Sequence, residues 1–357
     1  MKREKIIIWS TDVSNLHDGN ASGIGVQLYF WAQTFVRHGW EVITFTLHKS
    51  FKKDGISYKQ TRSWGKLEII HDWFHAFWLL LIVHPSIIML RGASRTAYPL
   101  AVLSSVFRTK FVFFGASDTN FEENEHVSGG NHNTLFYRRA VNKMSYVVTQ
   151  NQYQHDTLKK NYGKNSLVLY NLWGQFPNST SAVLKKTDIV WVANFAILKR
   201  AEWMINAAKA MPEYDFTLIG GKYRGQEDYY DDIEQEAKEV SNLHFIGKKS
   251  FAESNMIVSK SRVLCCTSTF EGFPNTFLQA WSNDIPVVST VNPSEVITTF
   301  GLGAVVRGEE EFQQCLRKLL QVKTYYEEVS ANIHDYFRAN HEADSVYEKF
   351  ISWLVGK

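Results

Sequence analysis

The sequence predicts an α/β protein built from two doubly wound domains in tandem. Apolar runs of strand length alternate with segments of helix length, and this alternation occurs twice along the 357 residues. A polar, irregular stretch, WGQFPNSTSAVLKK, separates the two series. A chain of this length is long enough for two domains, each with its own hydrophobic core. We therefore expect an N-terminal domain over 1–172, a linker over 173–186, a C-terminal domain over 187–335, and a last helix over 336–357 that packs back toward the N-terminal domain.

The first series opens with a strand, EKIIIWS, and a polar loop that brings Gly23 and Gly25 to the start of a helix, VQLYFWAQTFVRHG. The later strands and helices are, in chain order, WEVITFTLH, PSIIMLRG, AYPLAVLSSVFR, TKFVFFGAS, RRAVNKM, SYVVTQ, QHDTLKKNYG and SLVLYN. Strands that alternate with helices indicate a parallel sheet with both faces covered.

The second series repeats the pattern after the linker. Its expected elements are DIVWVAN, AEWMINAAKAM, DFTLIGG, YYDDIEQEAKEV, NLHFIG, FAESNMIVSK, RVLCC, TFLQAW, IPVVST and GLGAVV, followed by three helical segments from Glu309 onward. Ligands of open α/β sheets bind beyond the carboxyl ends of the strands. Two such sheets that face each other would therefore form a central binding cleft.

Composition favours a soluble, cytoplasmic protein. Hydrophobic residues make up 45% and charged residues 21% of the chain, which is ordinary for a globular fold. The start, MKREKIIIWSTD, has too short an apolar core for a signal peptide, and the longest later apolar run, residues 76–83, is less than half a bilayer span. Cys265 and Cys266 lie in a strand without disulfide or metal-ligand spacing, so we expect reduced core residues.

The net charge of +3 is unevenly divided. Residues 1–172 contain 20 Lys+Arg against 12 Asp+Glu, whereas the remainder contains 19 against 24. A basic N-terminal part suggests an anionic partner, such as the inner face of a membrane or a lipid phosphate. Chance scatter of surface charge explains the difference equally well. Nucleic acid is not expected, because no helix-turn-helix, zinc-finger or aromatic-basic strand motif appears.

The stretch EGFPN, residues 271–275, is predicted to be a turn between a strand and a helix. SRVLCC before it has strand length, and TFLQAW after it can bury apolar side chains on one helical stripe. Gly272 permits a tight or left-handed bend, and Pro274 suits the first turn of a helix. The N–H groups of such a turn attract phosphate. A phosphate beside the carboxylate of Glu271 suggests a sugar phosphate, whose hydroxyl-rich part separates the two charges.

With VWVANFAILK before it and SNDIPVV after it, EGFPNTFLQA resembles the donor motif of retaining GT-B glycosyltransferases, the "glycosyl transferases group 1" or family 4 type. The resemblance covers essentially the whole chain, up to the turn at residues 301–303. It implies a hexosyltransferase with a nucleotide diphosphate sugar as donor, a carbohydrate or lipid-linked acceptor and no metal or other cofactor. It also implies retention of configuration and a role in cell-surface polysaccharide or glycolipid assembly.

The resemblance also assigns residues. Glu271 would bind hydroxyls of the donor sugar, and Lys199 would contact the diphosphate, whose developing charge a fixed ammonium stabilises. Further donor-binding residues, which act mainly through backbone groups, would be Gly272, Phe273, Pro274, Asn275 and Thr276. A phosphate or acceptor contact is expected from the loop of Gly23 and Gly25. In the alternative interpretation neither residue binds a ligand: Glu271 caps a loop, and Lys199 is a solvent-exposed residue at the start of a helix.

The sequence departs from the family pattern in four places. Gln279 replaces a second glutamate that usually binds the ribose, and Asn194 stands where an arginine often joins the lysine. Arg200 follows Lys199 where glycine is common. The histidine frequent after the strand FVFF is absent, and Asp118 is the candidate for contacting the donor sugar or orienting the acceptor. We expect the neutral Gln279 to weaken donor binding without abolishing it.

Two other patterns have simpler explanations. HDWFH, from His71 to His75, is similar to a zinc-protease pattern but has no evident third ligand, so we expect histidines that flank a packed amphipathic helix. SGIGV lacks the full dinucleotide fingerprint. Besides the transferase, two functions stay open: a catalytically weak sugar-nucleotide-binding or scaffold subunit of a polysaccharide-assembly complex, and a sugar-nucleotide epimerase, which gains nothing from these motifs.

Overall fold

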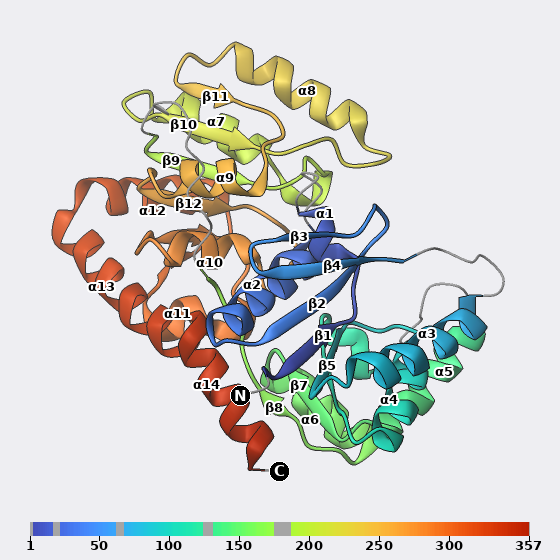
Figure 1. Ribbon diagram of the computed structural model, residues 1–357. Helices are drawn as coiled ribbons and strands as arrows, with labels where there is room; N and C mark the ends of the chain where they lie inside the picture. Colours follow the sequence, from blue (N-terminus) through green and yellow to red (C-terminus); the bar gives the residue numbers. More distant parts are fainter. Residues whose placement is uncertain (1–2, 17–21, 62–67, 124–130, 175–186, 357) are drawn as a thin grey trace. The chain divides into compact units, whose positions relative to one another are not determined.

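The chain folds into two compact units, which Figure 1 shows for the computed structural model. The first unit comprises Met1–Gly174 together with Glu342–Lys357, and the second comprises Gln175–His341. The structure describes residues 3–16, 22–61, 68–123, 131–174 and 187–356. Each unit is built on a sheet of mainly parallel strands flanked by helices, so the prediction of two doubly wound α/β domains in tandem is confirmed.

The first unit contains an eight-stranded sheet in the order β3-β4-β2-β1-β5-β6-β7-β8. Its strands are β1 Lys5–Ile8, β2 Glu41–Thr46, β3 Phe51–Lys53, β4 Ile56–Gln60, β5 Ile87–Arg91, β6 Lys110–Phe114, β7 Tyr146–Thr149 and β8 Leu167–Val168. All pairs are parallel except β3 and β4, an antiparallel hairpin that the sequence analysis did not predict. Because β1 pairs with both β2 and β5, the chain runs outward from β1 in two directions.

Helices cover both faces of this sheet and bury its apolar strands. They are α1 Asp12–Asn15, α2 Gly23–Arg37, α3 Glu68–Val83, α4 Ala97–Val106, η2 Asp118–Phe121, α5 Asn131–Lys143 and α6 Gln152–Tyr162. Helices α3, α4 and α5 lie side by side on one face, as Figure 1 shows. The three isoleucines of β1 are fully buried, and Ile7 and Ile88 belong to one core with Leu80 of α3 and Leu100 of α4.

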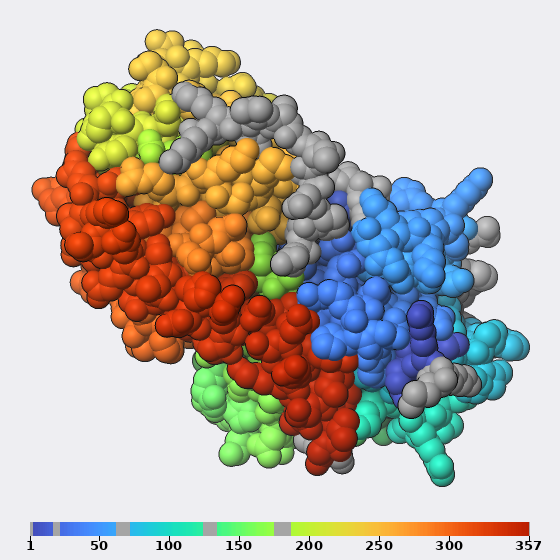
Figure 2. Space-filling model, turned by 60° about the vertical axis from the view of Figure 1, so that its left-hand side comes forward, coloured from blue at the N-terminus to red at the C-terminus, as the bar shows by residue number. Residues whose placement is uncertain are grey.

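The last helix, α14 Ala343–Val355, belongs to the first unit and packs on α2. The ring of Phe350 lies 5.1 Å from that of Trp31, and Trp40 donates a hydrogen bond of 2.8 Å to the hydroxyl of Tyr347. In Figure 2 these C-terminal residues (red) lie against N-terminal residues of the same unit (blue). The domain boundary expected at residue 335 falls inside a helix, and the division between the units follows His341 instead. Of the expected linker over 173–186, residues 175–186 lie outside the described residues.

The second unit contains a six-stranded parallel sheet in the order β11-β10-β9-β12-β13-β14. Its strands are β9 Ile189–Val192, β10 Phe216–Ile219, β11 Leu243–Phe245, β12 Val263–Cys266, β13 Val287–Ser289 and β14 Gly303–Val305. Its helices are η3 Ile197–Lys199, α7 Glu202–Ala210, α8 Glu227–Lys238, α9 Phe251–Val258, α10 Asn275–Trp281, η4 Pro293–Glu295, α11 Val296–Phe300, α12 Glu309–Gln321 and α13 Lys323–Asn340. Cys265 and Cys266 are buried free thiols in β12.

Candidate functional site

The loops that carry the predicted donor residues leave neighbouring strands of the second sheet. β9 pairs with β10 on one side and β12 on the other, so the direction of the strand order changes between β9 and β12. At such a switch point the loops after the two strands diverge and leave room for a ligand. Lys199 ends the short helix η3 after β9, and Glu271 lies between β12 and α10.

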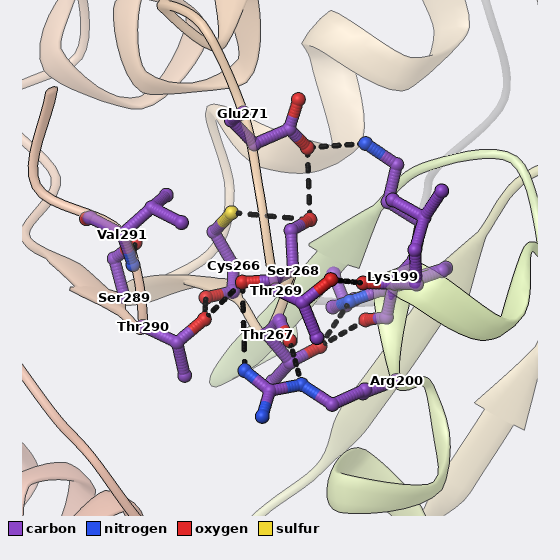
Figure 3. Close-up of polar contacts among 12 residues, drawn as sticks. Lys199, Arg200, Cys266, Thr267, Ser268, Thr269, Glu271, Ser289, Thr290 and Val291 are labelled. Atoms are coloured by element: carbon purple, nitrogen blue, oxygen red, sulfur yellow. Dashed lines mark hydrogen bonds and ion pairs between the residues drawn. The ribbon is translucent and has the colours of Figure 1, made fainter.

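Lys199 and Glu271 form an ion pair at this switch point, and Figure 3 shows their side chains pointing toward each other. Ser268 donates a second hydrogen bond of 2.8 Å to the same carboxylate oxygen, Oε1. The two side chains are 21% and 22% exposed, so each is half-buried yet open to a ligand. Among the described residues nothing hydrogen-bonds to Oε2 of Glu271, which is therefore available to a hydroxyl donor.

A hydrogen-bond network fixes the two loops relative to each other. The hydroxyl of Thr267 donates to the backbone oxygen of Lys199 at 2.6 Å and accepts from the indole of Trp191 at 3.0 Å. The amide of Thr269 donates to the oxygen of Leu198 at 2.8 Å. Each bond joins the β9 loop or strand to the β12 loop. The positions of the ammonium and the carboxylate therefore depend on backbone that is itself held in place.

Arg200 has a structural role beside this pair. Its φ of 50° is left-handed, which explains why glycine suits this position. The arginine side chain donates to the backbone oxygen of Thr267 at 2.6 Å and lies 4.3 Å over the ring of Trp203. Its guanidinium thus holds the β12 loop, as Figure 3 shows. The sequence analysis noted this departure but did not find its cause.

Residues 272–274 lie between β12 and α10, and Asn275 and Thr276 begin α10. Of the two expected forms of bend at Gly272, tight or left-handed, the left-handed one is not found: the chain bends there, its φ is not positive, and a β-carbon would meet open space. The ring of Phe273 packs toward His341 and Trp281, at 5.6 and 6.1 Å between ring centroids. Pro274 is the N-cap of α10, whose first residues are Asn275 and Thr276.

Asn194 and Gln279 make contacts away from the Lys199–Glu271 pair. Asn194 is exposed, and its side-chain oxygen accepts a hydrogen bond of 3.4 Å from the amide of Gly221. Gln279 is only 2% exposed, and its amide donates to the hydroxyl of Ser254 on α9 at 3.2 Å. Its predicted contact with a ribose stays a prediction, and the residue also joins α10 to α9.

The candidates in the first unit have structural partners. The amide of Gly25 donates to the hydroxyl of Ser22, the N-cap of α2, and a β-carbon on Gly25 would lie 2.7 Å from the backbone oxygen of Asp12. Close packing of α1 on α2 thus requires this glycine. Gly23 is exposed in the first turn of α2. Asp118 accepts hydrogen bonds from Asn151 at 2.8 Å and Gln154 at 3.0 Å, which joins η2 to the start of α6.

The histidine pattern falls on α3. The side chain of His71 lies outside the described residues, and His75 packs against the rings of Trp9 and Phe45, at 5.2 and 5.1 Å between ring centroids. In the part of the chain that the structure describes, no cluster of three or more histidine, cysteine or carboxylate side chains could hold a metal ion. His75 instead lines a cavity of about 410 Å³ in the first unit. The sequence analysis did not predict this cavity.

Comparisons with known proteins agree with this fold. Residues 186–322 match the family model described as "Glycosyl transferases group 1". No curated protein matches the sequence. None of the helices in the described ranges is long and apolar enough to cross a membrane.

Three solved structures resemble the whole chain at low identity. HepE of Anabaena, in complex with UDP and glucose, has 15% identity and a TM-score of 0.71, with 99% of this chain and 100% of that chain covered. Sucrose-phosphate synthase of Thermosynechococcus elongatus has 12% identity and a TM-score of 0.71, with 99% of each chain covered. The lipopolysaccharide outer core galactosyltransferase WaaB has 15% identity and a TM-score of 0.62, again with 99% of each covered. The chain therefore has the GT-B fold of glycosyltransferases, and its second unit contains a region that matches the glycosyl transferases group 1 family.

Proposed function

We propose that the protein is a glycosyltransferase that moves a hexosyl unit from a nucleotide diphosphate sugar to an acceptor hydroxyl, with retention of configuration. The observation that carries this proposal is the half-buried pair of Lys199 and Glu271 at the β9–β12 switch point, inside the matched region. An ammonium and a carboxylate side by side offer a positive and a negative partner to the two parts of a nucleotide-sugar donor, its diphosphate and its sugar. The ammonium suits the diphosphate, and the carboxylate suits the sugar hydroxyls.

The chemistry needs only groups that this site supplies. The bond between the anomeric carbon and the leaving phosphate oxygen breaks as the acceptor oxygen bonds to the same carbon. The acceptor proton goes to the leaving diphosphate, so no protein nucleophile forms a covalent intermediate. Lys199 stabilises the negative charge that develops on the diphosphate, as a metal ion would otherwise do. Burial raises the pKa of the nearby Cys266 thiol, which stays neutral and is not a candidate nucleophile.

The donor is proposed to be a UDP-sugar. One similar structure holds UDP and glucose, and others are sucrose-phosphate synthase and a galactosyltransferase. We assign the diphosphate and sugar contacts to Asn194, Gly272, Phe273, Pro274, Asn275 and Thr276, with Gln279 near the ribose. The acceptor would be a carbohydrate or lipid-linked sugar of cell-surface polysaccharide or glycolipid assembly, because one neighbour is a lipopolysaccharide galactosyltransferase.

The experiment combines donor consumption with product stereochemistry. The protein is incubated with a panel of UDP-sugars and extracted lipid-linked or saccharide acceptors, with and without excess EDTA. UDP release is measured, and the anomeric proton of the product is assigned by NMR. We expect transfer that survives EDTA and a product with the donor's anomeric configuration. Inversion would overturn the retaining assignment, and loss of activity in EDTA that Mg²⁺ or Mn²⁺ restores would overturn metal independence.

The alternative is a sugar-nucleotide-binding subunit with little catalysis, which the burial of Gln279 against Ser254 favours. Such a subunit would bind UDP through Lys199 without releasing UDP from any UDP-sugar, whether or not acceptor is present. Binding without turnover across the donor and acceptor panels would therefore support the subunit. Turnover with any pair would exclude it.

We further propose that the protein works at the inner face of a membrane and docks there through α3. This helix is apolar on two sides. Ala76 and Leu80 face the core, whereas its outer stripe is exposed, with Trp78 at 53% and Ile82 at 69%. Besides these two residues the outer stripe contains Phe74, Phe77 and Leu81. Five large apolar side chains at helical spacing fit the boundary between lipid headgroups and acyl chains.

The charges around the outer stripe favour an anionic lipid surface. Between residues 72 and 108 the other exposed side chains are His84, Ser105, Val106 and Arg108, and no carboxylate in this range is exposed. Asp72 is paired with Arg95 and shielded. Exposed arginine near an anionic surface contributes about 1 kcal/mol.

Co-sedimentation with vesicles of phosphatidylglycerol and phosphatidylcholine tests this docking. We expect binding by the wild-type protein, loss in a Trp78→Glu/Ile82→Glu variant, and no change in Val322→Glu, which alters an exposed apolar residue of the second unit. Failure of the wild type to bind, or a wild-type dimer that the α3 variant dissociates, would contradict a lipid surface as the partner.

A further inference from the structure

The first unit contains a cavity of about 410 Å³ at the carboxyl end of its sheet. It is lined by residues 9–12 after β1, Phe45 of β2, Thr61 after β4 and the end of β5, together with residues of α3 and of the loop before α4. β1 lies between β2 and β5, so the cavity stands at the switch point of this sheet, as the Lys199–Glu271 pair does in the other. Its volume falls in the range of about 300–1,000 Å³ that is typical of small-molecule sites.

Arg91, the last residue of β5, lines this cavity and forms no ion pair with a carboxylate of the described residues. One terminal nitrogen of its guanidinium donates to the side-chain oxygen of Asn171 at 2.7 Å, and its buried Nε makes no hydrogen bond with the described residues. Burial lowers the pKa of Arg91 to about 10, so the group stays charged at neutral pH.

A buried charge without a countercharge destabilises a fold, and an apolar residue of similar size in its place is often neutral or stabilising. The second arginine of the cavity, Arg95, differs in this respect, because its Nε donates to Asp72 at 3.3 Å. Of the two arginines that line the cavity, Arg91 is therefore the one whose charge no carboxylate of the described residues balances.

Further donors surround the same space. The hydroxyls of Ser94 and Thr96 lie 3.0 Å apart and line the cavity in the loop that leads from Arg91 to α4. Thr96 is the N-cap of this ten-residue helix, whose dipole adds positive potential at the cavity wall. The cavity also offers the groups that a sugar needs. Asp12 can accept hydrogen bonds from sugar hydroxyls, and the ring of Trp9 provides an apolar wall.

We propose that this cavity binds the acceptor and that the acceptor contains a phosphate ester beside free hydroxyls. The phosphate would lie on Arg91 and the hydroxyls of Ser94 and Thr96. A phosphate is favoured over a carboxylate because these groups supply donors from several directions, and phosphate presents more oxygens to them. That the ligand serves as an acceptor rests on the proposed glycosyltransferase function. The binding of a phosphorylated polyol to the cavity can be measured without it.

The test measures binding without nucleotide or transfer. Glucose 6-phosphate represents a soluble source, and phosphatidylglycerol in detergent micelles represents a lipid source of the same phosphate and hydroxyl chemistry. Each is titrated calorimetrically into the wild-type protein, Arg91→Met, and Arg139→Met, a control on the exposed side of α5. We expect at least one source to bind the wild type and the control, and to bind Arg91→Met about tenfold or more weakly. Glucose should not bind at the same concentrations.

A structural role for Arg91 gives a different result. If Arg91 only supports the fold, Arg91→Met should unfold at a lower temperature than the wild type, whereas an uncompensated cation predicts an equal or higher temperature. A Ser94→Asp variant, which places a negative charge at the cavity wall, should also weaken phosphate binding and keeps the proposal testable should Arg91→Met fail to fold. Binding of neither source to the wild type, or equal binding to the wild type and the variants, would overturn the proposal.

The two proposals can fail separately. UDP binding that depends on Lys199, without Arg91-dependent phosphate binding, would overturn the acceptor cavity and leave the donor site intact. Arg91-dependent phosphate binding without any UDP binding would support phosphate binding in the cavity and overturn the proposed glycosyltransferase function.

Discussion

Replacing Glu271 by glutamine should separate donor binding from sugar transfer. In the structure Oε1 of Glu271 holds the ammonium of Lys199 and the hydroxyl of Ser268. A diphosphate that recruits Lys199 must compete with this carboxylate and lie near its negative charge. Glutamine has nearly the same shape and still accepts from Ser268, but it neither holds the ammonium as strongly nor repels the diphosphate. The nucleotide should therefore bind more tightly while transfer declines.

The expected size follows from the exposure of the pair. Exposed ion pairs contribute about 0.2–1 kcal/mol, and charged hydrogen bonds roughly 1.5–3 kcal/mol. At 21% and 22% exposure the Lys199–Glu271 pair lies between these ranges. Neutral glutamine retains part of this interaction energy, and only the remainder appears as a gain in UDP binding. We therefore expect UDP affinity to rise by about two- to tenfold, or roughly 0.4–1.4 kcal/mol. Loss of the charged acceptor for the sugar hydroxyls should lower kcat/KM for transfer by about tenfold or more.

Calorimetric titration with UDP and a transfer assay measure the two effects in the same preparations. Glu239→Gln is the matched control, because Glu239 is exposed at the end of α8 and distant in sequence from both loops. It should change neither quantity. If Glu271→Gln weakens UDP binding tenfold, or leaves transfer at the wild-type level, the claim that Glu271 contacts both Lys199 and the donor sugar is wrong.

Other substitutions test the packing around the sites. Gly25→Ala should lower the free energy of unfolding by about 1–3 kcal/mol in chemical denaturation, because its β-carbon would lie 2.7 Å from the oxygen of Asp12; an unchanged value would contradict this packing. Gly272→Ala should leave stability within about 0.5 kcal/mol, since open space surrounds the position, and a larger loss would mean that the turn needs glycine. Gln279→Glu should destabilise the protein by about 1–3 kcal/mol at pH 7, because a carboxylate would be buried against Ser254; unchanged stability would contradict this cost of burial.

Most of the fold could be predicted because its strands are continuous apolar runs separated by segments of helix length. Parallel strands buried on both faces leave this signal in a single sequence. The hairpin of β3 and β4 leaves no such signal, since its strands Phe51–Lys53 and Ile56–Gln60 are short and rich in lysine, and of the two only β4 contains buried residues. The end of the second unit was also misplaced, because α13 continues through residue 335 without a breaking glycine or proline.

That Lys199 and Glu271 belong to one site was expected from two motifs of the resemblance, VWVANFAILK and EGFPN, and the structure brings the two side chains together as an ion pair. Their contacts with a donor stay a prediction. The cavity of the first unit could not be predicted, because its lining comes from five separate segments without a shared pattern. One signal was present in the sequence: Arg91 ends a buried strand, where an arginine must find a partner or a ligand. The packing role of Gly25 was equally hidden, since it depends on α1, a single turn of helix in the preceding loop.

The central claim is that Lys199 binds the diphosphate of a nucleotide-sugar donor. Calorimetric titration of UDP and UDP-glucose into the wild type, Lys199→Met and Lys209→Met tests it most directly, because Lys209 is an exposed lysine of the same unit on α7. We expect both ligands to bind the wild type and Lys209→Met alike, and Lys199→Met at least about tenfold more weakly, as the loss of one charged contact predicts. Equal affinity of Lys199→Met and the wild type would contradict the claim, and so would the absence of binding to the wild type.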